Sequence, residues 1–230
     1  MVSISYLVTV HNEGRTLANL LERLIQYINN EKDTDEIVIL DDFSDNPETK
    51  TILSNYSYRD NVRVYQHHLD NNYGAHKNFG TDLCINKYVF QIDGDELPTV
   101  DLVVNIGTII EANPDVELYF VPRINDFKGV KEEHAKQWGW HLSPCPACDN
   151  RPVVNWPDYQ GRVYKNEPAR IKWDRRLHEK IEGHLKFSQI PADTDLALYH
   201  DKTIETQIKT NMLYNEKFTE DENRGHGVFK

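Results

Sequence analysis

The strongest constraint on the fold is a regular alternation of strand-like and helix-like segments along the first 120 residues. Short apolar, β-branched runs, which are typical of buried strands, occur at residues 4–10, 36–40, 62–65, 88–92 and 116–121. Segments with helical apolar spacing or helix-start residues lie between them, at 17–28, 46–56, 74–85 and 99–113. This order predicts an α/β fold in which a mostly parallel sheet is flanked by helices on both faces.

The alternation ends near residue 122, and the second half of the chain has a weaker pattern. Residues 123–160 hold tryptophans among glycines and prolines with no clear period, and we expect a long loop there. Residues 161–200 suggest short strands, and residues 203–218 predict a terminal helix. Because 230 residues are too few for two domains that each have a full hydrophobic core, a single compact domain is predicted.

The charge balance limits the classes of partner. The chain has 26 lysines and arginines against 37 acidic residues, which gives a formal net charge of −11. A general nucleic-acid binder carries a basic footprint, so no nucleic-acid partner is expected. A phosphate-bearing ligand is compatible with this charge if a metal ion or a few local cations assist its binding.

Hydropathy and cysteine usage bear on location. No apolar run approaches the roughly 18 residues of a membrane span, so no integral membrane segment is expected. Cys84, Cys145 and Cys148 are too few for a disulfide scaffold and favour a reducing, cytoplasmic setting. Cys145 and Cys148 have metal-knuckle spacing, which His134 and His141 could complete as a zinc site. The alternative is a proline-stiffened loop with two free thiols.

Polar clusters follow three of the predicted strands. They occupy residues 11–14 after the first strand, 41–45 after the second and 93–96 after the fourth. The ligands of a doubly wound sheet bind beyond the carboxyl ends of its strands. We therefore expect these three clusters to converge on one edge of the sheet and to form the functional site.

The acidic turn after the fourth strand is a candidate metal site. Asp93 and Asp95 are separated only by Gly94 at a strand end, so both carboxylates can face one cation. Hard oxygen ligands suit Mg²⁺ or Mn²⁺, which then bridge diphosphate oxygens. A solvated acidic turn is the alternative interpretation.

Other candidate side chains each have a structural alternative. Asp42 could accept a hydrogen bond from a nucleobase or a ribose, or could cap the next helix. Lys77 could neutralise a phosphate, or could be a solvated helix lysine. His178 and Glu179 could supply a general base for a hydroxyl, or form an ordinary surface turn. His200 could be a metal ligand, or only a structural hydrogen-bonding group.

Taken together, these residues resemble a family 2 glycosyltransferase of the GT-A fold. Residues 9–13, Thr-Val-His-Asn-Glu, are similar to the family's strand ending in Tyr-Asn-Glu. Residues 41–45, Asp-Asp-Phe-Ser-Asp, resemble its Asp-Asp-Gly-Ser-x-Asp, and residues 93–98 its Asp-x-Asp motif with a trailing proline. Residues 74–80 are similar to its Ala-Arg-Asn-x-Gly segment, with Lys77 in place of arginine.

The resemblance extends more loosely into the second half and implies a role for each residue. The matching residues there are Arg162, His178-Glu179, His200 and the helix around Asn211. The implied ligands of Mn²⁺ or Mg²⁺ are Asp93, Asp95 and His200. The implied nucleotide-binding residues are Thr9, His11, Glu13, Asp42, Lys77, Asp93 and Gly94, with Asp42 reading the base, most often uracil. Glu179 is implied as the catalytic base with His178 as its orienter or rival, although the family's usual Glu-Asp pair is missing here.

The implied activity is metal-dependent transfer of a sugar from a nucleotide sugar, UDP-linked in many relatives, to a hydroxyl acceptor, with inversion. The acceptor would be a glycan, a lipid-linked molecule or a protein. Residues 1–122 would form the nucleotide-sugar-binding half, and residues 123–230 the acceptor-binding and catalytic half. Trp138 and Trp140 would either stack on an acceptor sugar or anchor their segment to the core.

Two other functions compete with this one. The first is a catalytically degenerate nucleotide- or sugar-binding module on the same scaffold. The second is a haloacid-type phosphohydrolase, which also has an Asp-x-Asp motif after an apolar strand. That family, however, places the motif at its first strand, whereas here it follows the fourth predicted strand.

Overall fold

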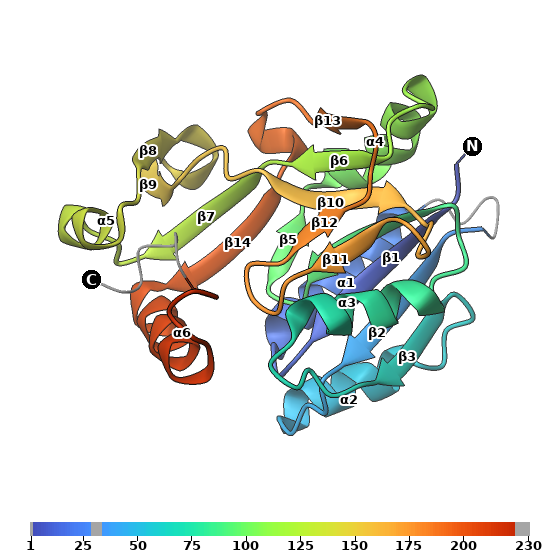
Figure 1. The fold of residues 1–230 in the computed structure, drawn as a ribbon, viewed down its shortest axis with the longest axis horizontal. Helices are drawn as coiled ribbons and strands as arrows, with labels where there is room; N and C mark the ends of the chain where they lie inside the picture. Colours follow the sequence, from blue (N-terminus) through green and yellow to red (C-terminus); the bar gives the residue numbers. More distant parts are fainter. Residues whose placement is uncertain (1, 29–33, 224–230) are drawn as a thin grey trace.

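The computed structural model describes residues 2–28 and 34–223, and its first half follows the predicted alternation (Figure 1). The strands of this half are β1 (Ile4–Val10), β2 (Glu36–Asp41), β3 (Val62–Gln66), β4 (Tyr88–Asp93), β5 (Glu96–Pro98) and β6 (Leu118–Val121). The helices are α1 (Arg15–Tyr27), α2 (Pro47–Tyr56), α3 (Tyr73–Leu83) and α4 (Val100–Ala112). The short strand β5, directly after the acidic turn, is additional to the predicted strands.

Residues 123–160 do not form the long loop expected from the sequence, and that prediction was wrong. They form β7 (Arg123–Lys128), α5 (Glu132–Trp138), β8 (Leu142–Cys145), a short 3₁₀ turn and β9 (Arg151–Val154). Strand β7 lacks a recognisable pattern because it buries polar side chains as well as apolar ones. Asn125 and Asp126 are as inaccessible to solvent as their neighbour Phe127. The apolar–polar alternation of a half-buried strand is therefore absent from its sequence.

The rest of the chain contains short strands and the predicted terminal helix. The strands are β10 (Gln160–Lys165), β11 (Lys172–Asp174), β12 (Lys180–Glu182), β13 (Phe187–Gln189) and β14 (Leu198–Thr203). The helix predicted for residues 203–218 is confirmed as α6 (Ile204–Lys217). In the part of the chain that the structure describes, no helix combines the length and apolar character needed to cross a bilayer.

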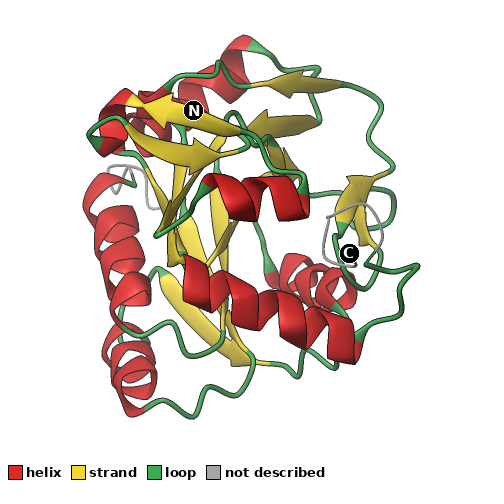
Figure 2. Cartoon of the chain, turned by 90° about the vertical axis from the view of Figure 1, so that its left-hand side faces the viewer, coloured by secondary structure: helices red, strands yellow, loops and turns green. Residues whose placement is uncertain are grey.

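Seven strands form the central sheet, in the order β13-β6-β10-β4-β1-β2-β3. β1 pairs in parallel with β2 and β4, whereas β10 runs antiparallel between β4 and β6. α3 and the β11–β12 hairpin cover one face of this sheet (Figure 1), and the side view shows helices on both sides of the strands (Figure 2). The predicted α/β fold with a mostly parallel sheet is confirmed.

The local sequence explains why these helices form where they do. On α1, Leu17, Leu20, Leu21 and Leu24 recur at helical spacing and are fully buried against the sheet. The N-termini of four helices are capped by side chains that accept hydrogen bonds from otherwise unpaired backbone N–H groups. These caps are Asn46 on α2, Asn72 on α3, Thr99 on α4 and Thr203 on α6.

A second sheet of five strands, β5-β14-β7-β9-β8, adjoins the first. β14 lies between β5 and β7, antiparallel to β5 and parallel to β7. The chain passes from the central sheet into this second sheet between β4 and β5, at Gly94 and Asp95. The acidic turn predicted to be functional therefore lies where the two sheets join.

Candidate active site

The register of the central sheet sets the position of Asp93. Asp93 ends β4, and the parallel pairing places it beside Thr9 of β1, whose Oγ1 donates to Asp93 Oδ1 over 3.0 Å. Gly94 follows, and a Cβ atom there would lie 3.1 Å from both the Glu13 side chain and the Thr9 carbonyl oxygen. The lack of a side chain at Gly94 therefore lets the turn approach the end of β1 closely, which brings the first and third polar clusters together.

Two cations hold the Asp93 carboxylate. Arg162, on the neighbouring strand β10, places Nη2 2.7 Å from Asp93 Oδ2, and Lys77 of α3 places Nζ 3.1 Å from Oδ1. Arg162 also contacts Gln91 and Glu96, so the β4–β5 turn and β10 are tied together. Burial alone would raise the pKa of Asp93, but the attraction of Arg162 and Lys77 holds it well below the ordinary range. Asp93 is therefore ionised at neutral pH.

Lys77 is a buried lysine that connects the two halves of the chain. Only 3% of Lys77 is exposed, which excludes the solvated-lysine interpretation. Its Nζ donates to Glu179 Oε1 over 2.6 Å and lies 4.7 Å from the centre of the Trp173 ring. Burial raises the pKa of Glu179, yet the Lys77 ammonium outweighs this effect and lowers it. Glu179, the predicted base, is thus kept as a carboxylate within reach of Asp93.

Asp95 lies beside His200, the residue that the resemblance implies as its fellow metal ligand. In the antiparallel pairing of β14 with β5, His200 lies opposite Glu96, the residue that follows Asp95. The distance from His200 Nε2 to Asp95 Oδ2 is 3.3 Å. His200 belongs to the second half of the chain, so long-range strand pairing assembles this pair.

A hydrogen bond from Asn125 of β7 determines which nitrogen of His200 carries the proton. Asn125 Nδ2 donates to Val154 O and to Asp158 Oδ2, so its Oδ1 is an acceptor. The His200 Nδ1 atom, 2.8 Å from that oxygen, must therefore donate. Burial lowers the pKa of His200 and favours the neutral ring. Its Nε2 then presents a lone pair toward the carboxylate of Asp95.

This arrangement fits a divalent cation. Two acceptors, His200 Nε2 and Asp95 Oδ2, converge, and the opposite ring nitrogen is held by an amide oxygen, as is usual for a metal-ligating histidine. Among residues 2–28 and 34–223 there is no group of three His, Cys, Asp or Glu side chains ready to enclose a metal. Mg²⁺ and similar ions commonly use one or two carboxylates and complete their shell with water and substrate phosphates. A site with few protein ligands is therefore adequate.

The first and second polar clusters also meet. His11 Nδ1 is 2.8 Å from the carbonyl oxygen of Asp42, and the Asp42 carboxylate accepts from the backbone N–H of Leu69 at 3.0 Å. Glu13 accepts from the backbone N–H of His11 at 2.6 Å, and burial raises its pKa to about 7. The helix-cap role considered for Asp42 is filled instead by Asn46. The expected convergence of the three clusters on one sheet edge is therefore observed.

The remaining predicted groups lie at the edge of this assembly. His178 has a left-handed backbone (φ 52°), and its Nε2 is 2.8 Å from Asn223 Oδ1. Its ring also packs edge-on against Tyr214 of α6. Burial lowers the pKa of His178, so its ring is neutral at pH 7. His178 thus joins the chain before Glu179 to the C-terminal helix.

Trp138, at the end of α5, and Trp140, directly after it, pack against each other, and Phe127 connects them to His200. The rings of Trp138 and Trp140 are 4.6 Å apart, and Trp140 contacts Phe127, whose ring is 5.7 Å from that of His200. Trp138 is only 9% exposed. These contacts favour the anchoring role over an acceptor platform for Trp138.

Cys145 and Cys148 are buried, with sulfur atoms 2.8 Å apart. Burial raises the pKa of Cys148 to about 12. His134, proposed above as a further zinc ligand, stacks on Trp138 instead. The arrangement agrees with two thiols in a proline-stiffened turn.

Sequence reasoning missed several side chains that complete the site. Lys202 of β14 places its Nζ 3.0 Å from Asp95 Oδ2. Asn125 lies in the segment that was expected to be a loop, so nothing in the sequence pointed to it. Strand alternation could have suggested Lys202, because it lies two residues after His200 and thus on the same side of the strand. The other missed groups form an ion network behind Asp93 and are Glu96, Arg123 and Asp158.

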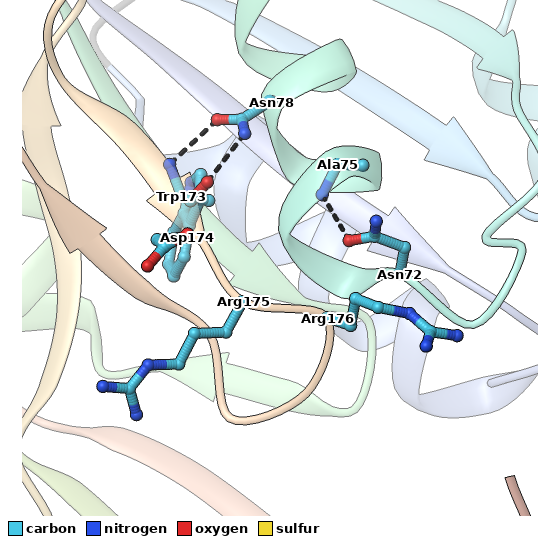
Figure 3. A pocket seen from close by; sticks show the side chains of 7 residues that line it. All are labelled: Asn72, Ala75, Asn78, Trp173, Asp174, Arg175 and Arg176. Carbon is cyan, nitrogen blue, oxygen red and sulfur yellow. Dashed lines mark hydrogen bonds between the residues drawn. The ribbon is translucent and has the colours of Figure 1, made fainter. Parts of the chain in front are cut away.

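A separate pocket of about 320 Å³ opens between α3 and the chain around β11 (Figure 3). In the close-up, Asn78 exchanges two hydrogen bonds with the backbone of Trp173, while the side chains of Arg175 and Arg176 extend away from each other. None of the predicted site residues lines this pocket. Its lining residues are Asn72, Ala75, Asn78, Trp173, Asp174, Arg175 and Arg176.

Known proteins resemble this chain in sequence pattern and in fold. The model of the family described as glycosyl transferase family 2 matches residues 5–217. A crystal structure of S. aureus TarS 1-349 superposes with a TM-score of 0.56 at 18% identity, covering 94% of this chain and 65% of that one. The same TarS fragment in complex with UDP-GlcNAc gives a TM-score of 0.58 at 18% identity, covering 87% and 58%. The chain thus spans about two thirds of that fragment or less, and no curated protein sequence matches it.

Proposed function

The chain belongs to glycosyl transferase family 2, and on that premise we propose that it transfers a sugar from a nucleotide sugar, UDP-linked, to a hydroxyl acceptor. The observation that carries this proposal is the convergence at one sheet edge of two sets of groups. The first is Asp95 with His200, two acceptors suited to a divalent cation. The second is Asp93 with Lys77 and Glu179, a buried charge cluster that contains an ionised base.

On the donor side, residues 1–122 provide most of the contacts. We assign the nucleobase to Asp42 and His11 and the ribose to Thr9 and Asp93. Glu13 and Gly94 shape the turn between them, and Lys77 provides positive charge toward the diphosphate. The solved complex of TarS with UDP-GlcNAc supports a UDP-sugar as the donor, because that protein has the same fold.

Asp95 and His200, with Asp93 nearby, would hold Mn²⁺ or Mg²⁺. Such a cation acts as a Lewis acid and stabilises the negative charge that develops on the departing diphosphate. His200 contributes its Nε2 lone pair because Asn125 keeps the proton on Nδ1. A protein with a net charge of −11 could bind a diphosphate in this way.

On the acceptor side, residues 123–230 supply the base. The Glu179 carboxylate takes the proton from the acceptor hydroxyl as the oxygen attacks the anomeric carbon. A single displacement of this kind inverts the anomeric configuration. His178 acts as an orienting group, because its contacts to Asn223 and Tyr214 fix the chain next to Glu179. The acceptor is a glycan, a lipid-linked molecule or a protein, and the three thiols support a cytoplasmic setting.

The two competing functions receive less support. A haloacid-type phosphohydrolase carries its motif on the first strand, whereas Asp93 ends β4. A degenerate binding module would not require a buried lysine that keeps Glu179 ionised. Binding of UDP without release of nucleotide from any sugar donor would favour that second alternative.

The decisive experiment measures the affinity for UDP with and without Mn²⁺. We expect Mn²⁺ to strengthen UDP binding in the unaltered protein, and Asp95→Ala to remove that gain because it deletes a cation ligand. Asp201→Ala is a matched control: it removes an acidic residue next to His200 that is paired with Lys128 instead. An affinity for UDP that changes neither on addition of Mn²⁺ nor in Asp95→Ala would contradict the proposal.

A further inference from the structure

Lys202 lies on the side of β14 that faces the proposed cation site. His200 and Lys202 are two residues apart on this strand, so both side chains leave the same face. Asp201, between them, leaves the opposite face and pairs with Lys128 at 2.7 Å. The strand thus presents one imidazole and one ammonium group to Asp95.

Both groups lie close to the same oxygen atom, Oδ2 of Asp95. Lys202 Nζ is 3.0 Å from Asp95 Oδ2, the atom that lies 3.3 Å from His200 Nε2. A divalent cation bound to this oxygen would lie within a few ångströms of the ammonium and would repel it. The lysine and the divalent cation therefore compete for the same oxygen of Asp95.

The exposure of Lys202 allows its ammonium group to move away from Asp95. Its side chain is 20% exposed, whereas that of His200 is 8% exposed, so the ammonium lies on the more open side of the pair. Lysine carries its charge on a flexible four-carbon stem. An incoming diphosphate brings several negative charges to this side of the site and offers the ammonium an alternative partner.

We propose that Lys202 is a resident cation that neutralises Asp95 in the free protein, moves to the diphosphate when nucleotide binds, and so couples nucleotide and divalent-cation binding. This inference rests on the proposed function. Because coupling between two binding sites is reciprocal, each ligand strengthens the other by the same factor. Without nucleotide the lysine competes with the metal; with nucleotide that competition is removed.

The test is a direct titration of Mn²⁺ binding, followed by its paramagnetic signal, with and without UDP. We expect Lys202→Met to bind Mn²⁺ at least about fivefold more tightly than the unaltered protein without UDP, within the usual range of such couplings. The strengthening of Mn²⁺ binding by UDP should decrease by the same factor. Lys202→Arg keeps the charge and should resemble the unaltered protein, and Lys202→Gln repeats the test with a polar side chain.

The control is Lys128→Met, which removes the same charge from the adjacent strand β7. It should leave Mn²⁺ affinity unchanged, because Lys128 pairs with Asp201 on the other face. Equal or weaker Mn²⁺ binding by Lys202→Met, or equal tightening by Lys128→Met, overturns the inference while leaving the glycosyltransferase proposal intact. Failure of all variants to bind Mn²⁺ and UDP overturns both.

Discussion

At the scale of single residues, the buried ammonium of Lys77 links the charge states of two carboxylates in the site. It contacts Glu179 and Asp93 from a position that is 3% exposed. Two carboxylates in such a place would repel each other and favour protonation. The lysine therefore keeps Glu179 ionised, and together with Arg162 it keeps Asp93 ionised. This role can be measured as a function of pH.

Lys77→Met should move the acidic limb of the pH profile of kcat/KM to higher pH. Glu179 must be ionised to act as a base, and its pKa is lowered by Lys77 against the effect of burial. Without the lysine, burial remains and the pKa of Glu179 rises, because the carboxylate has lost an adjacent cation. Initial rates across pH, measured for the unaltered protein and both Lys77→Met and Lys77→Arg, check this shift.

The arginine variant separates charge from shape. It keeps a cation in place and should leave the acidic limb close to its original position, even if the rate decreases. An unmoved limb in Lys77→Met would mean that Glu179 is not the group whose ionisation limits the reaction. Loss of the buried pair should also cost about 3 kcal/mol of stability, because Glu179 loses its cation partner.

Glu13 should make the protein less stable as the pH rises toward neutrality. Burial raises its pKa from 4.5 to about 7, so the folded protein keeps this proton where the unfolded chain has released it. Stability is then lost between those two pH values. Glu13→Gln should melt a few degrees higher than the unaltered protein at pH 8 and equally at pH 4. Thermal unfolding at both values, with the exposed Glu22→Gln as control, tests this expectation.

At the scale of elements, β7 shows how an undetected strand can contribute to chemistry. Its Asn125 fixes the tautomer of His200, and the parallel pairing of β7 with β14 aligns the two residues directly. Asn125→Leu removes the acceptor for the Nδ1 proton. We expect a loss of about 10- to 100-fold in Mn²⁺ affinity, as for other partners of metal-ligating histidines.

The same Mn²⁺ titration in the presence of UDP measures this effect. Asn105→Leu, an exposed position on α4, makes the same change away from the site and should have no effect. If Asn125→Leu bound Mn²⁺ as tightly as the unaltered protein, His200 would not depend on this partner. The lone-pair argument for the cation site would then lose its basis.

The elements of the first half could be predicted because each buries a continuous apolar face. The leucines of α1 and the apolar run of β1 carry their own period, so local sequence and final burial agree. Strand β7 could not be predicted, because Asn125 and Asp126 become buried only through partners distant in sequence. Arg151 of β9 pairs with Asp126, for example, and such long-range pairs leave no local pattern.

The residues of the candidate site also divide into those that the sequence predicted and those that it did not. Asp93, Asp95, Glu179 and His200 were predicted because strand ends and a resemblance identified them. Lys202 was not, because its position beside Asp95 follows from that of His200, which the pairing of β14 with β5 brings to the acidic turn. Lys77, for which the sequence left both a phosphate-binding and a solvated role open, is buried because α3 packs beside β11, a strand of the second half.

At the scale of the whole molecule, strands from the first and second halves of the chain are interleaved in one sheet. β10, from the second half, lies between β4 and β6 of the first. A fragment of residues 1–122 therefore lacks the strand that joins β6 to the rest of the sheet. We expect it not to fold alone, which the dispersion of its amide NMR signals would test. A dispersed, native-like spectrum would contradict this expectation.

The passage of the chain between the two sheets has a mechanical consequence. Asp93 belongs to the central sheet, and the strand that begins immediately after Asp95 belongs to the other, with one glycine between the carboxylates. Any ligand that contacts both carboxylates would connect the two sheets and restrain the rotation of one sheet against the other. Occupancy should then slow amide hydrogen exchange in β14 and β7 of the second sheet as well as in β4 of the central sheet. A ligand bound across the two carboxylates would in this way also stiffen the molecule.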